Sequence, residues 1–150
     1  MAPQFSVEAL NREHVEPVVA LLQAQMHEHE IATSADALRS VVEHVLADAR
    51  HGFVLVAAAD RTPVGIAYAA AHLSAEHGGV VGWLEELYVS PGARGSGVGS
   101  ALLAEVARRA RALDWRALEL EVVAGHERAM PLYLRHEFTL TARTRFTRVF

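Results

Sequence analysis

The residues best suited to chemistry form a glycine-rich run, Arg94-Gly95-Ser96-Gly97-Val98-Gly99, in the second half of the chain. Leu87 to Val89 before it are typical of a strand end, and Ala101-Leu102-Leu103 after it begin a helical pattern. Successive glycines let backbone N–H groups point into one concavity, and a helix N-terminus adds partial positive charge there. The run therefore predicts a turn that binds a pyrophosphate.

Two common phosphate-binding motifs fit this run less well. A nucleoside-triphosphate P-loop ends in Gly-Lys-Ser/Thr, and Gly99-Ser100 has no lysine between its residues, which excludes that motif. A dinucleotide fingerprint needs glycine or alanine where Ser100 stands, although Glu119 lies about twenty residues further on, as that motif requires. The run also follows an apparent antiparallel meander rather than the first strand of a parallel unit. A dinucleotide-binding domain stays open as an alternative.

A pair of adjacent carboxylates, Glu85 and Glu86, lies on the strand that leads to this turn. Regular alternation along a strand puts them on opposite faces, Glu85 with Leu87 and Glu86 with Tyr88. Burial within an apolar strand raises the pKa of a carboxyl group toward values useful for a general base. Alternatively, either residue is an ordinary strand glutamate whose side chain is exposed to solvent, and this interpretation fits both positions equally well.

Metal chemistry has little support in the sequence. The chain has nine histidines and no cysteine, and His27-Glu28-His29-Glu30 does not contain the His-Glu-x-x-His spacing of a zinc helix. Solvated loop histidines are the simpler interpretation, and we expect no metal site.

Length and composition favour one domain over residues 1–150. With 51% apolar residues in 150, the chain can bury a substantial core. The net charge of −4 argues against general nucleic-acid binding. No apolar stretch reaches membrane-spanning length, and the first eight residues lack the basic and apolar segments of a secretory signal. We therefore expect a cytoplasmic protein with neither nucleic acid nor membrane as a partner.

Apolar periodicity predicts the helices and strands that position the glycine-rich turn. Their order indicates an α/β (α+β) fold. The expected elements, in order, are a strand at 5–9, helices at 16–26 and 36–50, strands at 53–59, 64–73 and 80–89, a helix after the glycine-rich run, a strand at 117–123, a helix at 127–136, and a terminal strand or pair at 138–150. The second helix has capping-box-like spacing at Thr33 and Asp36.

The glycine-rich run resembles the acetyl-coenzyme A motif of the GNAT superfamily of N-acetyltransferases, which is Arg or Gln, two residues, Gly, any residue, then Gly or Ala. The order of elements is similar to that of the family over nearly the whole chain. The closing segment, Ala129-Met130-Pro131-Leu132-Tyr133 with Glu137-Phe138, also resembles the family's pattern. The resemblance implies a mixed, mostly antiparallel sheet of six to seven strands with about four helices, splayed at the fourth and fifth strands.

The closing segment departs from that pattern at two positions. His126 stands where the family often has asparagine, and Glu137 replaces a glycine before Phe138. Pro131 removes one backbone donor from the last helix and is expected to distort it.

The resemblance implies an acetyl-CoA-dependent N-acetyltransferase that acts by direct attack in a ternary complex and needs no metal. It implies that Tyr133 protonates the departing thiolate. Glu85 and Glu86 are candidates for the base, as are the loop histidines, and Glu85 matches the position of a glutamate in polyamine-type members. A backbone N–H near Leu87 or Tyr88 would stabilise the oxyanion. Coenzyme-binding positions implied in this way are Leu87, Tyr88, Val89, Arg94, Gly95, Ser96, Gly97, Val98, Gly99, Ser100, His126 and Tyr133.

The acceptor and assembly are less constrained. The expected acceptor is a primary amine of a small molecule or peptide, and Glu28 and Glu30 near Glu85 and Glu86 would favour a cationic one, such as a polyamine or aminoglycoside. Many relatives pair through the terminal strands, so we expect a homodimer. A non-catalytic acetyl-CoA-binding sensor of the same fold is an alternative function.

Overall fold

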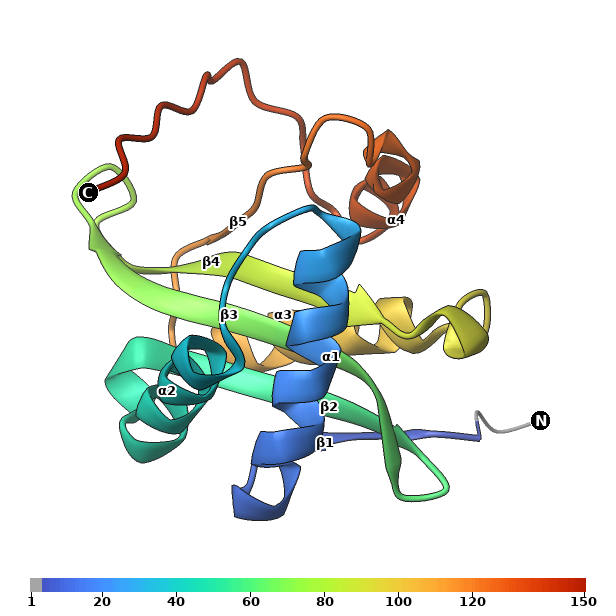
Figure 1. Ribbon diagram of the computed structural model, residues 1–150. Helices are drawn as coiled ribbons and strands as arrows, with labels where there is room; N and C mark the ends of the chain where they lie inside the picture. The colour runs from blue at the N-terminus through green and yellow to red at the C-terminus, as the bar shows by residue number, and fades with distance from the viewer. Residues whose placement is uncertain (1–3) are drawn as a thin grey trace.

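The computed structural model describes residues 4–150 and arranges them around one five-stranded sheet (Figure 1). The strands lie in the order β1-β2-β3-β4-β5, and every pairing is antiparallel except the parallel one between β4 and β5. The strand bounds are β1 Ser6–Ala9, β2 Gly52–Ala59, β3 Thr62–Ser74, β4 Gly79–Val89 and β5 Leu118–Glu119. The helices are α1 Val15–Glu28, α2 Ala35–Ala47, α3 Val98–Ala112 and α4 Met130–Arg135. The first three residues of the expected 1–150 domain lie outside the described part.

Capping residues fix where the first two helices begin. Asn11 caps a short 3-10 turn, Arg12–His14, that leads directly into α1. Ser34 accepts a hydrogen bond from the Ala37 backbone N–H at 3.2 Å and caps α2, so the expected cap at Thr33 is wrong by one residue. The second helix also ends earlier than residue 50, because Asp48 starts a separate 3-10 turn.

Helices cover both faces of the sheet and divide the core into two clusters. On one face, α1 and α2 pack over β2 and β3 through side chains that include Val18, Val42, Val56 and Ile66. On the other face, α3 packs through Leu102 and its neighbours (Figure 1). The apolar spacing of i, i+3 and i+4 in each helix explains why a single side of it is buried.

A β-bulge interrupts the pairing of β3 with β4 where the two adjacent carboxylates lie. Tyr68 pairs with Glu86, but the next residue, Ala69, pairs with Leu84, so Glu85 has no opposite residue. Leu84 belongs to the cluster on the α3 face, whereas Tyr68 packs on the α1 face. A bulge breaks strict alternation locally. Sequence periodicity could not reveal this extra residue.

The sheet splays between β4 and β5, as the resemblance implied. Only two pairs form, Gly82 with Leu118 and Trp83 with Glu119, and β5 then continues as a coil that turns away from β4 (Figure 1). The expected strand at 117–123 is therefore much shorter in the structure.

Among the described residues the sheet has five strands, fewer than the six to seven expected. The segment 138–150 forms no strand and runs as a coil across the β4–β5 side of the molecule (Figure 1). Pro131 falls in the first turn of α4, where no backbone donor is needed, so the expected distortion is absent from this helix. Within residues 4–150, no helix is both long enough and apolar enough to cross a membrane.

Candidate coenzyme and acceptor site

The glycine-rich run forms a tight turn at the N-terminus of α3. Gly95 and Gly97 have φ angles of 76° and 89°, a conformation that side-chain-bearing residues rarely adopt, and Gly97 is the N-cap. A Cβ added at either position would meet no atom within 4 Å. The surface in front of the turn is therefore open, and the free N–H groups of the first helical turn border it. Such a cradle fits a pyrophosphate.

Arg94 fastens this turn to two other elements. Its Nε donates to the Val89 carbonyl at 2.8 Å, and its Nη2 donates to Glu28 Oε1 at 2.7 Å. The guanidinium also lies 5.5 Å from the centre of the Tyr88 ring, and the Tyr88 hydroxyl donates to the same carboxylate. The end of β4, the turn and the last turn of α1 thus form one connected unit. Glu28 is consequently engaged at the turn.

Ser100 connects α3 to α4, a contact that sequence analysis did not find. Its Oγ lies 2.7 Å from Nε2 of His136, the residue that ends α4. No motif links these two positions, because they are far apart in the sequence and meet only in the fold. The pair holds α4 against the start of α3, beside the open cradle.

The last residues of β4 offer an unpaired backbone edge. Leu87, Tyr88 and Val89 pair with β3 on one side, whereas β5 has already diverged on the other. Within residues 4–150, backbone groups on that side lack ladder partners, and those not already bonded, as the Val89 carbonyl is to Arg94, can bind an extended ligand. The predicted oxyanion position, near Leu87 or Tyr88, therefore lies on this edge.

Tyr133 lies on α4, on the same side of the sheet as α3. It packs against the cluster that includes Leu87 and Val89, and its ring meets Phe138 edge-on at 5.9 Å. Burial raises the pKa of the Tyr133 hydroxyl, so the group keeps its proton at neutral pH. A protonated phenol here can act as an acid.

Glu85 and Glu86 face the same side, contrary to the expected alternation. Glu86 lies opposite Tyr68 on the α1 face. Glu85 borders an open hollow together with Ala70 and Trp83, which pair with each other on that same face. The bulge residue has thus been turned toward its neighbour instead of away from it.

Crowding of these carboxylates changes their acidity. Burial, and then the charge of Glu85, raises the pKa of Glu86 to about 7. Burial also raises the pKa of Glu85, although the positive charge of Arg145 opposes the effect. A carboxyl group that titrates near neutral pH suits a general base, because it is both largely ionised and basic enough to accept a proton.

Two histidines contact each other between the end of α1 and the turn before α4. The rings of His29, which ends α1, and His126, which precedes α4, lie 4.4 Å apart. Burial, and then the charge of His126, lowers the pKa of His29. His126 therefore contacts α1, an arrangement that its sequence position did not suggest. Glu30 lies just beyond, exposed in the loop between α1 and α2.

The structure gathers most of the expected residues into two adjoining areas. The cradle at residues 94–100 and the edge at 87–89 form one area. Glu85 and Glu86, which directly precede that edge on the same strand, begin the other. Within the described residues, no three histidine, aspartate or glutamate side chains gather in a way that could hold a metal ion.

These features define an α/β protein with an open glycine-rich turn beside a splayed strand pair, and comparison with known proteins identifies the family. The model of the acetyltransferase (GNAT) family matches residues 17–138. The chain belongs to this family.

One curated relative is mycothiol acetyltransferase of Stackebrandtia nassauensis. Identity is 33% over 118 residues, which cover 73% of this chain and 37% of the relative. The chain therefore spans little more than a third of the relative's length.

Solved structures share the fold across the whole chain. An integron cassette protein from the mobile metagenome of Cole Harbour Salt Marsh superposes with a TM-score of 0.86 and 26% identity, covering 98% of this chain and 90% of the other. Aminoglycoside N-acetyltransferase AAC(6')-Iy, in complex with the bisubstrate analogue CoA-S-monomethyl-acetylneamine, superposes with a TM-score of 0.84 and 24% identity, covering 97% of each chain. At that identity, the second likeness concerns the fold alone.

Proposed function

We propose that this protein transfers an acetyl group from acetyl-CoA to a primary amine of a small molecule or peptide, by direct attack in a ternary complex. The observation that carries the proposal is the juxtaposition of the open cradle at Gly95 and Gly97 with the unpaired edge of β4. One feature suits a pyrophosphate, and the other suits the amide-bearing arm of a coenzyme. Membership of the acetyltransferase family supports the same assignment.

In this proposal, backbone N–H groups of residues 94–100 hold the pyrophosphate, and the edge at Leu87 to Val89 orients the thioester. Acetyl-CoA supplies the activated acetyl group. The neutral amine forms the new C–N bond as the C–S bond breaks, and a backbone N–H on the edge stabilises negative charge on the carbonyl oxygen. Removal of the amine proton and protonation of the thiolate then require a base and an acid.

Glu86 is the better candidate for the base and Tyr133 for the acid. Glu86 has the more strongly raised pKa, about 7, because it is more buried than Glu85. Tyr133 approaches from the α3 face, whereas Glu86 lies on the α1 face, so the two groups are on opposite sides of β4. That arrangement separates the proton acceptor from the proton donor across the open edge.

Thermal unfolding with and without acetyl-CoA tests the coenzyme, with NAD as the control ligand. A ligand that binds only the folded protein raises the unfolding midpoint by mass action. We expect a rise with acetyl-CoA alone. A rise with NAD alone would replace the proposal with a dinucleotide-binding function.

An assay of free thiol release with a panel of amines then separates an enzyme from a coenzyme sensor. We expect release in the wild type and a loss of about 10²-fold or more in kcat for Tyr133→Phe, the usual size of a general-acid contribution. Tyr88→Phe is the matched control, because it keeps the backbone edge and loses only the hydroxyl contact with Glu28. Coenzyme binding without thiol release for any amine would favour the sensor.

A further inference from the structure

The C-terminal segment places the positive charge of Arg145 in the hollow that borders Glu85. The hollow, about 350 Å³, is open and shallow, with Ala70 and His72 from β3 and Trp83 and Glu85 from β4 in its lining. Arg145 completes the lining from a segment that follows these strands by more than fifty residues. Small alanine side chains leave the floor of the hollow free.

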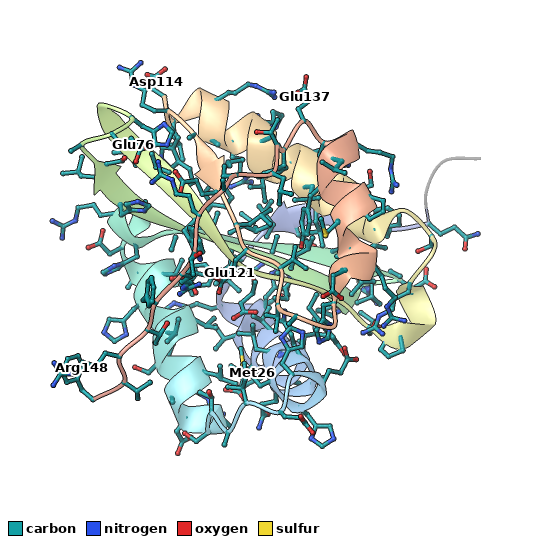
Figure 2. The ribbon with its side chains drawn as sticks, turned by 90° about the horizontal axis from the view of Figure 1, so that it is seen from above. Met26, Glu76, Asp114, Glu121, Glu137 and Arg148 are labelled. Atoms are coloured by element: carbon teal, nitrogen blue, oxygen red, sulfur yellow. The ribbon has the colours of Figure 1, made fainter. Side chains whose placement is uncertain are left out.

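Arg145 makes the contacts that a bound organic cation would make. Its guanidinium carbon lies 5.2 Å from the centre of the Trp83 ring, within the range of a cation–π contact. The same group forms an ion pair with Glu121, and its charge opposes the rise in the pKa of Glu85. Figure 2 shows Glu121 beside the C-terminal coil, between Glu137 and Arg148. The hollow therefore combines the Trp83 ring and the Glu85 carboxylate around one cation, and Glu121 binds the same cation from outside the lining.

The attachment of Arg145 is weak enough to be exchanged. The side chains of Arg145 and Glu121 are 54% and 43% exposed, and ion pairs at such positions contribute little net stability. Within residues 4–150, no strand pairs with the segment 138–150 to hold it in place. A ligand with its own positive charge can thus take the place of the guanidinium without unfolding any element.

The hollow lies at the correct distance from the proposed reaction centre to receive a second charge of the acceptor. Trp83 and Glu85 precede Leu87 by four and two residues on β4, which corresponds to about 7 to 13 Å at the rise of a strand. Glu86, the proposed base, lies between the hollow and the edge. An amine attacking beside Glu86 could therefore extend a distal ammonium into the hollow.

We propose that Trp83, Glu85 and Glu121 form a subsite for a second positive charge of the acceptor, and that Arg145 fills this subsite until the acceptor displaces it. The acceptor class is then a diamine or a larger polycation, and the C-terminal segment competes with it. This inference rests on the proposed function for its biological meaning, because only a transferase has an acceptor. The binding that it predicts can be measured without acetyl-CoA.

Isothermal titration calorimetry with 1,5-diaminopentane, and with 1-aminopentane as the singly charged control, tests the subsite. Removing the internal competitor by Arg145→Gln should tighten diamine binding threefold or more and leave monoamine binding unchanged. Trp83→Leu should weaken diamine binding fivefold or more. Arg143→Gln is the matched control. Arg143 pairs with Glu76 instead, and its substitution removes the same charge from the same segment.

Equal effects of Arg145→Gln and Arg143→Gln would overturn the inference, because they would reflect net charge alone. Failure of both the wild type and Arg145→Gln to bind the diamine would also overturn it. A purely structural Arg145 would instead lower the unfolding midpoint in Arg145→Gln without changing the preference for diamine over monoamine. Loss of the acetyl-CoA thermal shift concerns the proposed function and leaves these binding results interpretable.

Discussion

Ser100 Oγ and His136 Nε2 lie 2.7 Å apart and join the first turn of α3 to the end of α4. Because the pair is partly buried, removing one partner leaves the other side chain with an unsatisfied polar group that water replaces only in part. We expect Ser100→Ala and His136→Ala each to lower the free energy of unfolding by about 1 kcal/mol. The double variant should lose less than the sum of the two, which a double-mutant cycle by urea denaturation measures. Strictly additive losses would mean that the two side chains act independently.

Gly97 caps α3 in a left-handed conformation and borders the proposed pyrophosphate cradle. Gly97→Ala should cost about 1–2 kcal/mol of stability through backbone strain and should also abolish the acetyl-CoA thermal shift. Gly78 provides the control, because it has a φ of 68° in the β3–β4 hairpin and is likewise surrounded by open space. Gly78→Ala should carry similar strain yet keep the thermal shift. If both variants keep the shift, the cradle does not hold the coenzyme.

Glu86 should impose an acidic limb on the pH–rate profile, with kcat/KM falling as pH decreases through about 7 and the base becomes protonated. Glu86→Gln should remove the limb together with most of the activity. Glu85→Gln should move it to lower pH, because the charge of Glu85 helps to raise the pKa of Glu86. A limb that persists unchanged in Glu86→Gln belongs to the ammonium group of the acceptor instead.

The same carboxyl group links stability to pH. Its pKa rises from 4.5 to about 7 on folding, so the folded state binds the proton more tightly. Its stabilising contribution is complete below pH 4.5 and is lost as pH rises to about 7. Glu86→Gln should therefore be more stable than the wild type at pH 8, by up to about 3 kcal/mol, and the difference should vanish near pH 4.5. Urea denaturation at both pH values measures this change.

Local patterns predicted the elements that build the site, but contacts between distant residues had to come from the fold. Apolar periodicity located α1, the β2–β4 meander and α3, because each buries one face on a common sheet. Periodicity assumes regular alternation, so it put Glu85 and Glu86 on opposite faces and missed the bulge. Periodicity also could not predict the contact between Arg145 and Trp83, because the alternating C-terminal sequence indicated a strand.

Glu137 occupies a position that suits glycine, with a φ of 66° just after α4. The resemblance to the family had already suggested a glycine there. A side chain in the left-handed region costs about 1–2 kcal/mol of stability. Glycine avoids this strain, but it also raises the conformational entropy of the unfolded chain, which offsets part of the gain. Glu137→Gly should therefore raise the free energy of unfolding by about 0.5–1 kcal/mol. Unchanged or lower stability in urea denaturation would show that the weak Arg111–Glu137 ion pair outweighs the strain.

The C-terminal segment exposes several large apolar side chains to solvent. Leu140, Phe146, Val149 and Phe150 are 81%, 91%, 87% and 102% exposed, whereas Arg143 and Arg145 bind the body of the protein. Exposed apolar groups gathered in one segment usually mark an interface. We therefore expect a homodimer in which a second copy covers these side chains, detected as twice the chain mass by light scattering. Phe146→Ser with Phe150→Ser should yield the monomer, whereas a monomeric wild type would contradict the prediction.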